Sequence, residues 1–288
     1  MSDSGHGLPE ALLIDLDGVL YEDEEAIPGA AEAVGWVQEQ GIPHLFLTNT
    51  TSRPRSALVD KLHRMGIHTE PSRIVAPPYA ANRWLHSHID GPVALFVDDR
   101  TIGEFADIEI TDAADLGPVS AVVVGDYSDS WTYSELNRAF RLLMTEPQPT
   151  LIALGMTRYW HAADGLRLDT APFVVALQHA SGIEPVVVGK PATPFFETAL
   201  AELGAPAEKT WMIGDDISGD ISGAQRAGMR GLLVQTGKYR PGDLDLGVHP
   251  DALIPSIGEL PTWPESHPWK LNGSDAAESK SRFNFGGD

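Results

Sequence analysis

The segment LLIDLDGVLYEDE, residues 12–24, begins with three apolar residues that are typical of a buried strand, and then places Asp15 and Asp17 two positions apart. Residues two apart on a strand point to the same face. We therefore expect two neighbouring carboxylates at the end of an apolar strand. Because their charges repel each other, folding alone does not explain them. The pattern predicts a cation or a reacting group between them.

Composition limits the classes of protein to which the chain can belong. It has 288 residues, 42% hydrophobic and 21% charged, enough to bury the core of one large or two ordinary domains. The formal net charge of −21 argues against a nucleic-acid partner, which binds basic patches. Cysteine is absent, which excludes disulfides and thiolate metal sites. With no apolar run near the ~20 residues of a membrane helix and no signal-peptide pattern, we expect a cytoplasmic protein without a membrane partner.

Apolar runs alternate with helical patterns along the chain, which predicts an α/β fold with a parallel sheet and right-handed crossovers. The C-terminal part is instead rich in Pro, Ser, Gly and Asn without apolar periodicity, which predicts a loose tail. The strand Val186–Val188 is expected to return to the core after an insertion. The expected divisions are a core over 1–89, an inserted α/β domain over 90–182, the rest of the core over 183–260 and the tail over 261–288.

Chemically reactive residues follow four of the strands predicted for the core. The four groups are Asp15 with Asp17, Thr48 with Asn49, Lys190, and Asp215 with Asp216 and Asp220. Each group alone also suits a structural role, since Asp, Thr and Asn form turns and acidic residues stabilise helix starts. In an open parallel sheet, however, the carboxyl ends of the strands lie along one edge, where ligands bind. The coincidence favours a site in which carboxylates hold Mg²⁺ while a hydroxyl and an ammonium hold a phosphoryl group.

These four groups resemble the four motifs of the haloacid dehalogenase superfamily of phosphohydrolases. The insertion between the second and third motifs is similar to the α/β cap of class IIA (C2-type) members, the NagD and p-nitrophenylphosphatase-like group. The run Gly214–Arg240 also resembles the phospholysine phosphohistidine inorganic pyrophosphate phosphatases and the haloacid-dehalogenase-like hydrolase domain-containing proteins. The resemblance spans roughly residues 10–242. It implies a Rossmann-like core with an inserted cap domain.

The resemblance also implies a Mg²⁺-dependent phosphatase with an aspartyl-phosphate intermediate. Asp15 would be the nucleophile, and Asp17 would act first as the general acid and then as the general base. The metal would be bound by the Asp15 carboxylate, the Asp17 backbone carbonyl and Asp215. Some relatives carry serine at the position of Asp17, so the aspartate in this chain makes both proton transfers available.

The remaining motif residues would bind the phosphoryl group or support the site. Thr48 and the backbone amide of Asn49 would bind phosphoryl oxygens, and Lys190 would compensate the negative charge of the nucleophile and the phosphate. Asp216 and Asp220 would have supporting roles, with Asp220 the stronger candidate.

The cap is expected to select the leaving group, and the candidate residues are Tyr127, Arg158, Tyr159 and His161. Packing in the cap core or in a dimer interface is an alternative role for Tyr159, whereas Arg158 is a hypothetical partner for a second anion. The expected substrates are small phosphorylated metabolites, with phosphoramidates and pyrophosphate as further candidates. Relatives suggest a homodimer.

Several other functions share part of this pattern. A non-enzymatic phosphate-binding or regulatory protein could use the same fold, but the intact Asp17 argues against it. A receiver domain has a similar set of acidic residues, threonine and lysine, but it needs about half this length and no insertion. A dehalogenase would not need the Mg²⁺ ligands, and a dinucleotide enzyme would need a G-x-G-x-x-G after the first strand, which is absent.

Overall fold

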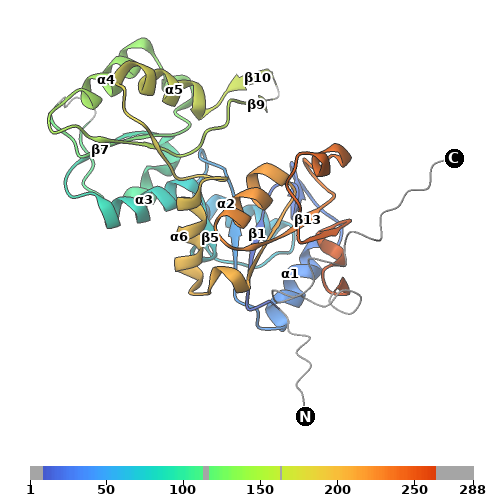
Figure 1. Ribbon diagram of the computed structural model, residues 1–288. Helices are drawn as coiled ribbons and strands as arrows, with labels where there is room; N and C mark the ends of the chain where they lie inside the picture. Colours follow the sequence, from blue (N-terminus) through green and yellow to red (C-terminus); the bar gives the residue numbers. More distant parts are fainter. Residues whose placement is uncertain (1–8, 113–116, 163, 264–288) are drawn as a thin grey trace.

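The computed structural model of the chain describes residues 9–112, 117–162 and 164–263. Its larger lobe is built on a parallel sheet of six strands (Figure 1). In spatial order these are β14 (Ala252–Ile254), β13 (Arg230–Val234), β12 (Thr210–Gly214), β1 (Ala11–Asp15), β4 (His44–Leu47) and β5 (Ile74–Val75). The chain runs from β1 outward through β4 and later returns on the other side through β12, so the strand order reverses at β1. Such a reversal marks the ligand-binding crevice of doubly wound sheets.

Helices cover both faces of the six-stranded sheet. One face carries α1 (Ala30–Glu39) and α2 (Arg55–Arg64), and the other carries α3 (Pro77–His88), α6 (Thr193–Leu203) and α7 (Gly223–Arg226). Strand β1 supplies both apolar cores, because Leu12 and Ile14 pack on the side of α1 whereas Leu13 packs on the side of α3. A parallel strand covered on both faces is apolar throughout, which explains the run that precedes Asp15.

The segment between α3 and α6 forms a smaller lobe (Figure 1). Its parallel sheet has the order β11 (Val186–Val187), β8 (Thr150–Ala153), β7 (Ala121–Val124) and β6 (Val93–Phe96). Helices α4 (Tyr133–Leu143) and α5 (Thr170–Ser181) cover one face, and the hydroxyl of Thr132 caps α4. Residues of the opposite face join the apolar cluster that contains α3, so the two lobes share buried surface.

The parallel α/β architecture with an insertion is confirmed, but the placement predicted for the strand at 186–188 was wrong. Val186 and Val187 pair with β8, so this strand completes the smaller sheet and does not return to the larger one. The error has a simple cause. Three consecutive valines predict a strand, but so short a segment carries no pattern that distinguishes one parallel sheet from another.

Several elements were not predicted. Helix α3 begins at Pro77, and proline is well suited to a first helical turn because its missing N–H is not needed there. Two antiparallel hairpins pair β2 (Tyr21–Glu22) with β3 (Glu25–Ala26) and β9 (Tyr159–Ala162) with β10 (Gly165–Leu168).

Two other expectations concern the ends of the chain and membranes. From residue 264 onward, the predicted tail lies outside the described residues. Among the residues that are described, none of the helices has the length and apolar character needed to cross a membrane.

Replacing Leu13 with alanine is expected to lower the free energy of unfolding by about 2–5 kcal/mol, because the side chain is fully buried and truncation leaves a cavity between the central strand and α3. Urea unfolding would measure this change. Leu246→Ala is the matched control, since Leu246 is 63% exposed and its truncation should change stability by less than about 0.5 kcal/mol. Equal effects of the two substitutions would contradict the assignment of Leu13 to the core.

Candidate active site

Asp15 is the last residue of β1 and is buried at the carboxyl edge of the larger sheet, with 4% of its surface exposed. Its Oδ1 accepts a hydrogen bond from the amide of Leu16 (2.8 Å) and lies 2.6 Å from Nζ of Lys190. Within the described part of the chain, Oδ2 has no hydrogen-bond partner. Burial raises the pKa of Asp15, and the Lys190 ammonium opposes that rise. One oxygen is therefore held in place while the other is available to a ligand.

Asp17 lies beyond the end of β1 and is exposed. Its backbone forms an isolated bridge with Tyr21, and Gly18 turns the chain with a φ of 83°. We expected the alternation of side chains along the strand to align the two aspartates. It positions only Asp15, and the turn at Gly18 positions Asp17. The pair has one buried and one exposed carboxylate, and such a difference in surroundings suits the two groups to different chemical roles.

Lys190 lies between two buried carboxylates, with Nζ 2.6 Å from Asp15 and 2.7 Å from Asp220. Burial alone would lower the pKa of Lys190, but the two carboxylates raise it above its ordinary value, so the amine remains charged. The side chain of Asn49 fixes the backbone of this residue. Its Oδ1 accepts from the Lys190 amide (2.8 Å) and its Nδ2 donates to the Lys190 carbonyl (2.9 Å). The second and third motifs are thus joined directly.

Asp215 follows β12 and is 1% exposed. Its Oδ2 accepts a hydrogen bond from the amide of Lys238 (2.7 Å), whereas Oδ1 is buried with no hydrogen-bond partner among the residues that the structure describes. Gly18 and Gly237, both with positive φ, approach this carboxylate so closely that a Cβ atom would lie 2.0 Å or 2.1 Å from Oδ2. Because a buried oxygen without a donor is costly, the unpaired Oδ1 fits a carboxylate that binds a cation.

Carboxylate oxygens of Asp15, Asp215 and Asp220 lie within 4.8 Å of one another. Burial, together with the charge of Asp220, raises the pKa of Asp215 to about 6, and burial together with the charge of Asp15 raises that of Asp220 to about 7. Lys190 neutralises only part of this negative charge. Oxygen ligands of this kind suit a hard divalent cation, so the cluster can hold a metal ion. It contains two of the predicted metal ligands and adds Asp220.

The two aspartates predicted to support the site differ in what they contact. Asp216 begins the π-helical turn η5 (Ile217–Ser222) and accepts hydrogen bonds from two backbone amides of that turn (3.0 and 2.8 Å). Asp220 is fully buried and packs against Gly214 of the larger sheet. A Cβ atom on Gly214 would lie 2.3 Å from the Cβ of Asp220, so this contact requires glycine. Asp216 therefore stabilises the turn, and Asp220 positions the ammonium of Lys190.

Thr48 is the first residue after β4 and is buried. Strands β1 and β4 pair in parallel with Asp15 opposite Leu47, so Thr48 leaves the sheet next to Asp15. Its hydroxyl donates to Oγ1 of Thr50 (3.0 Å) and accepts from the Thr50 amide (3.1 Å). The strand order thus brings Asp15, Thr48 and Asp215 to one edge of the larger sheet, and the contacts of Lys190 with Asp15 and Asn49 add the remaining group.

Lys238 belongs to the same site but was missed in the sequence. Its Nζ lies 3.6 Å from Asp216, and the nearby carboxylates raise its pKa despite partial burial, which would lower it. A signal for this residue exists in the sequence. Gly237 and Lys238 follow β13, so the rule that selected the other strand ends would also have selected this one.

The residues proposed to select the leaving group occupy different places in the smaller lobe. Tyr127 packs against Phe96 and Trp131 in the apolar core of this lobe, with ring centroids 5.9 and 5.3 Å away. Arg158 lies 5.8 Å from the ring of Tyr159, which is 47% exposed on β9. The side chain of His161 lies outside the described set. Among the described residues, no hydrogen bond or ion pair links these candidates to the buried carboxylates.

Comparisons with known proteins agree with this arrangement. Residues 12–111 match the family model described as haloacid dehalogenase-like hydrolase, and residues 187–260 match a model described as HAD-hydrolase-like. The chain is similar to the phospholysine phosphohistidine inorganic pyrophosphate phosphatase of Bos taurus, with 40% identity over 241 residues, 81% of this chain and 85% of the relative. It is also 40% identical over 236 residues to the Bos taurus haloacid dehalogenase-like hydrolase domain-containing protein 2, covering 82% and 88% of the two chains.

Solved structures give the same result for the fold. The p-nitrophenyl phosphatase from Archaeoglobus fulgidus superimposes with a TM-score of 0.80 at 26% identity, over 88% of this chain and 98% of that one. NagD from E. coli K-12 superimposes with a TM-score of 0.78 at 26% identity, over 87% and 98%. The similarity therefore includes the inserted lobe as well as the larger sheet.

A divalent cation is expected to raise the melting temperature of the metal-free protein more at about pH 8 than at about pH 5. The pKa values of Asp215 (about 6) and Asp220 (about 7) are raised, so the folded state binds more protons and its stability falls as the pH rises from about 4 to about 7. A bound cation would relieve this loss. Thermal unfolding across pH, with and without the cation, would measure the difference.

Two variants give the control for this experiment. Asp215→Asn should abolish the cation-dependent shift, whereas Asp216→Asn, which removes the same charge from the neighbouring position, should retain it. Shifts of equal size in the two variants would show that the cation does not bind at Asp215.

Proposed function

The chain belongs to the haloacid dehalogenase-like hydrolases, and from that premise we propose that it is a Mg²⁺-dependent phosphatase acting on small phosphate esters through an aspartyl-phosphate intermediate. The observation that carries the proposal is the surroundings of Asp15. Its Oδ1 is held by Lys190 and a backbone amide, its Oδ2 is free, and the unpaired Oδ1 of Asp215 belongs to the same carboxylate cluster.

In the first step, Oδ2 of Asp15 would attack phosphorus, and the bond from phosphorus to the leaving oxygen would break. Asp17, which is exposed beside the turn, would donate its proton to that oxygen. Thr48 would bind a phosphoryl oxygen, and Lys190 would keep the nucleophile ionised by neutralising the charge around it. The product of this step is an acyl phosphate, a mixed carboxylic–phosphoric anhydride, on Asp15.

In the second step, water would attack the same phosphorus and the bond to Asp15 would break, releasing inorganic phosphate. Asp17 has lost its proton in the first step, so it can now accept one from the water. The different surroundings of the two aspartates support this division of roles, since Lys190 contacts Asp15 and Asp17 is open to solvent.

Mg²⁺ fits the donor set, because Asp15 and Asp215 offer only carboxylate oxygens. When bound, it would neutralise the charge that develops on the phosphoryl oxygens. We assign the metal to Asp15, the backbone carbonyl of Asp17 and Asp215. Asp220 remains the partner of Lys190, because its Oδ1 is 2.7 Å from the ammonium group and its Oδ2 accepts a hydrogen bond from the Asp216 amide (3.1 Å).

The names of the curated relatives suggest which compounds to test. They refer to phospholysine, phosphohistidine and inorganic pyrophosphate, so phosphoramidates and pyrophosphate belong in the substrate panel with ordinary phosphate esters. We further propose that the inserted lobe, acting as a cap, takes part in selecting the leaving group, and that the protein forms a homodimer.

The proposed nucleophile can be tested with p-nitrophenyl phosphate. Wild-type protein is expected to release phosphate only when Mg²⁺ is present, and Asp15→Asn should abolish this turnover because an amide oxygen is a poor nucleophile. Asp216→Asn, which removes a nearby carboxylate that caps η5, should retain most of the activity. Turnover by Asp15→Asn at the wild-type rate would overturn the assignment. If wild-type protein were inert on the whole panel of phosphate compounds, the protein would not be a phosphatase.

The dual role of Asp17 predicts a distinct kinetic signature. Asp17→Asn is expected to lower steady-state turnover of p-nitrophenyl phosphate by roughly 10²–10⁴-fold. Because p-nitrophenolate leaves without an acid, the first step should remain faster than the second, and rapid mixing should show a burst of nitrophenol stoichiometric with enzyme. Loss of activity without a burst would show that Asp17 does not act in the breakdown of the intermediate.

A further inference from the structure

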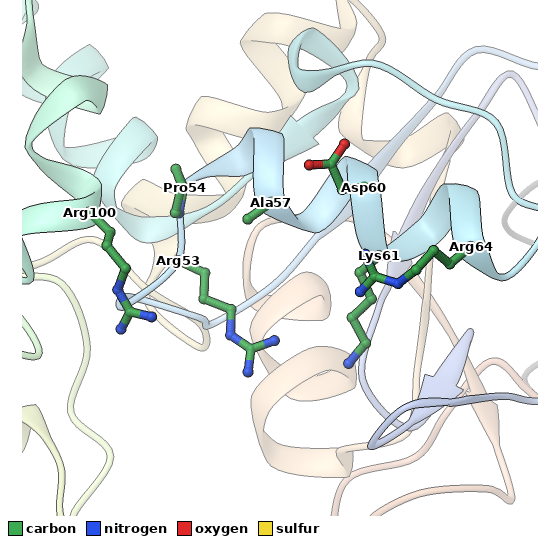
Figure 2. Close-up of a pocket in the computed structure, with 7 residues that line it drawn as sticks. All are labelled: Arg53, Pro54, Ala57, Asp60, Lys61, Arg64 and Arg100. Carbon is green, nitrogen blue, oxygen red and sulfur yellow. The ribbon is translucent and has the colours of Figure 1, made fainter.

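A cationic cavity of about 390 Å³ adjoins helix α2 (Figure 2). Four of the residues that line it are basic, Arg53, Lys61, Arg64 and Arg100, and one, Asp60, is acidic. Such a concentration of positive charge is unexpected on a chain with a formal net charge of −21. Three of the basic residues come from α2 and the loop before it, whereas Arg100 comes from the inserted lobe.

The charged ends of Arg53, Lys61 and Arg100 extend to the same side of α2, and the carboxylate of Asp60 points to the opposite side (Figure 2). Arg53 is the basic residue most available to a ligand. It is exposed, and in the described part of the chain no carboxylate forms an ion pair with it. Arg100 in contrast is paired with Asp98 at 2.7 Å.

The other two basic residues are close to one acidic side chain. Lys61 and Arg64 lie 3.6 and 3.9 Å from Glu24. The side chain of Lys61 is also nearly buried, since only 6% of the residue is exposed, and its ammonium donates to the carbonyl of Asp23. A single glutamate therefore faces two cations here, and the wall of the cavity retains positive charge.

Tyr21 connects this cavity to the catalytic carboxylates. Nζ of Lys61 lies 3.8 Å from the centroid of the Tyr21 ring, and the backbone of Tyr21 forms the bridge with Asp17. Burial raises the pKa of Tyr21, as do the charges of Asp17 and Asp15, while the charge of Arg53 opposes this rise. Arg53 is also in the loop that leaves β4 after Thr48. The cavity thus adjoins the side of the site at which Asp17 would meet the leaving group.

We propose that this cavity binds a second anionic group of the substrate, a phosphate or a carboxylate joined to the scissile phosphate by a short carbon chain, with Arg53 as its main contact. The inference rests on the proposed phosphatase function and specifies its substrate class. A guanidinium group binds either anion through two parallel hydrogen bonds, and charge-assisted bonds of this kind are the stronger ones. Since Arg53 belongs to the larger lobe and Arg100 to the smaller, the same anion would contact both lobes.

The test compares alkanediol bisphosphates of increasing chain length with alkyl monophosphates of the same lengths, using Mg²⁺-loaded protein. The wild type should prefer the bisphosphate at one chain length by roughly tenfold to a hundredfold in kcat/KM. Arg53→Gln and Arg100→Gln should each reduce this ratio, the former more. Phosphooxy carboxylic acids of matched length form a second series, which distinguishes a phosphate-binding cavity from a carboxylate-binding one.

Two further arginine variants complete the test, one as a control and one as an alternative contact for the anion. Arg141→Gln removes one charge from the exposed side of α4, outside the cavity, and should leave the ratio unchanged. Arg158→Gln tests the residue that the sequence suggested for a second anion. If the ratio depended on Arg158 and not on Arg53, or if the wild type had no preference at any length in either series, the proposal would be wrong.

Binding measurements separate this proposal from the phosphatase mechanism. Titration calorimetry on Asp15→Asn protein, which should not turn over substrate, would compare the preferred bisphosphate with its monophosphate, with and without Arg53→Gln. Tighter binding of the bisphosphate that depends on Arg53 would support the cavity even if every ester proved inert. Equal affinities for the two compounds would mean that these side chains are only solvated surface cations.

Discussion

The contact of the Lys190 ammonium with the carboxylates of Asp15 and Asp220 is the interaction on which the site depends. Three carboxylates with oxygens within 4.8 Å of one another cannot all remain charged in a buried position without cations. Lys190 provides a cation in direct contact with two of them, and Asn49 keeps it there by holding its backbone. The larger sheet must therefore place β1, β4 and β12 side by side before any chemistry is available.

Much of this arrangement could be predicted from the sequence, because parallel strands put their carboxyl ends on one edge. Asp15, Thr48 and Asp215 each follow a strand whose buried, apolar residues identify it without knowledge of the fold. The glycines around Asp215 were less accessible to such reasoning. Gly18 and Gly237 are far apart in sequence, and their need to be glycine comes from a shared neighbour that only the folded chain reveals.

The features that escaped prediction depend on contacts between distant segments. The cavity at α2 needs Arg53 from one lobe and Arg100 from the other, and no local pattern relates them. The exposed position of Asp17 follows from where β1 ends, and strand ends are poorly determined by propensity. Lys190 was predicted to belong to the site and lies beside Asp15, yet the strand that leads to it was assigned to the wrong sheet. The sequence thus indicated which residues belong to the site more readily than it indicated the strands and loops that position them.

The segment that leads to Lys190 links the two lobes. The amide of Val188 donates to the carbonyl of Ala153 in the smaller sheet (2.9 Å), while the amide of Lys190 donates to Asn49 in the larger lobe (2.8 Å). At this crossing only Gly189 separates the two bodies. The other connection runs from α3 to β6, and the two lobes also share an apolar cluster, so a movement of the smaller lobe involves more than Gly189. The hydrogen bonds of this one short segment thus tie the sheet of the smaller lobe to the charge balance of the buried carboxylates.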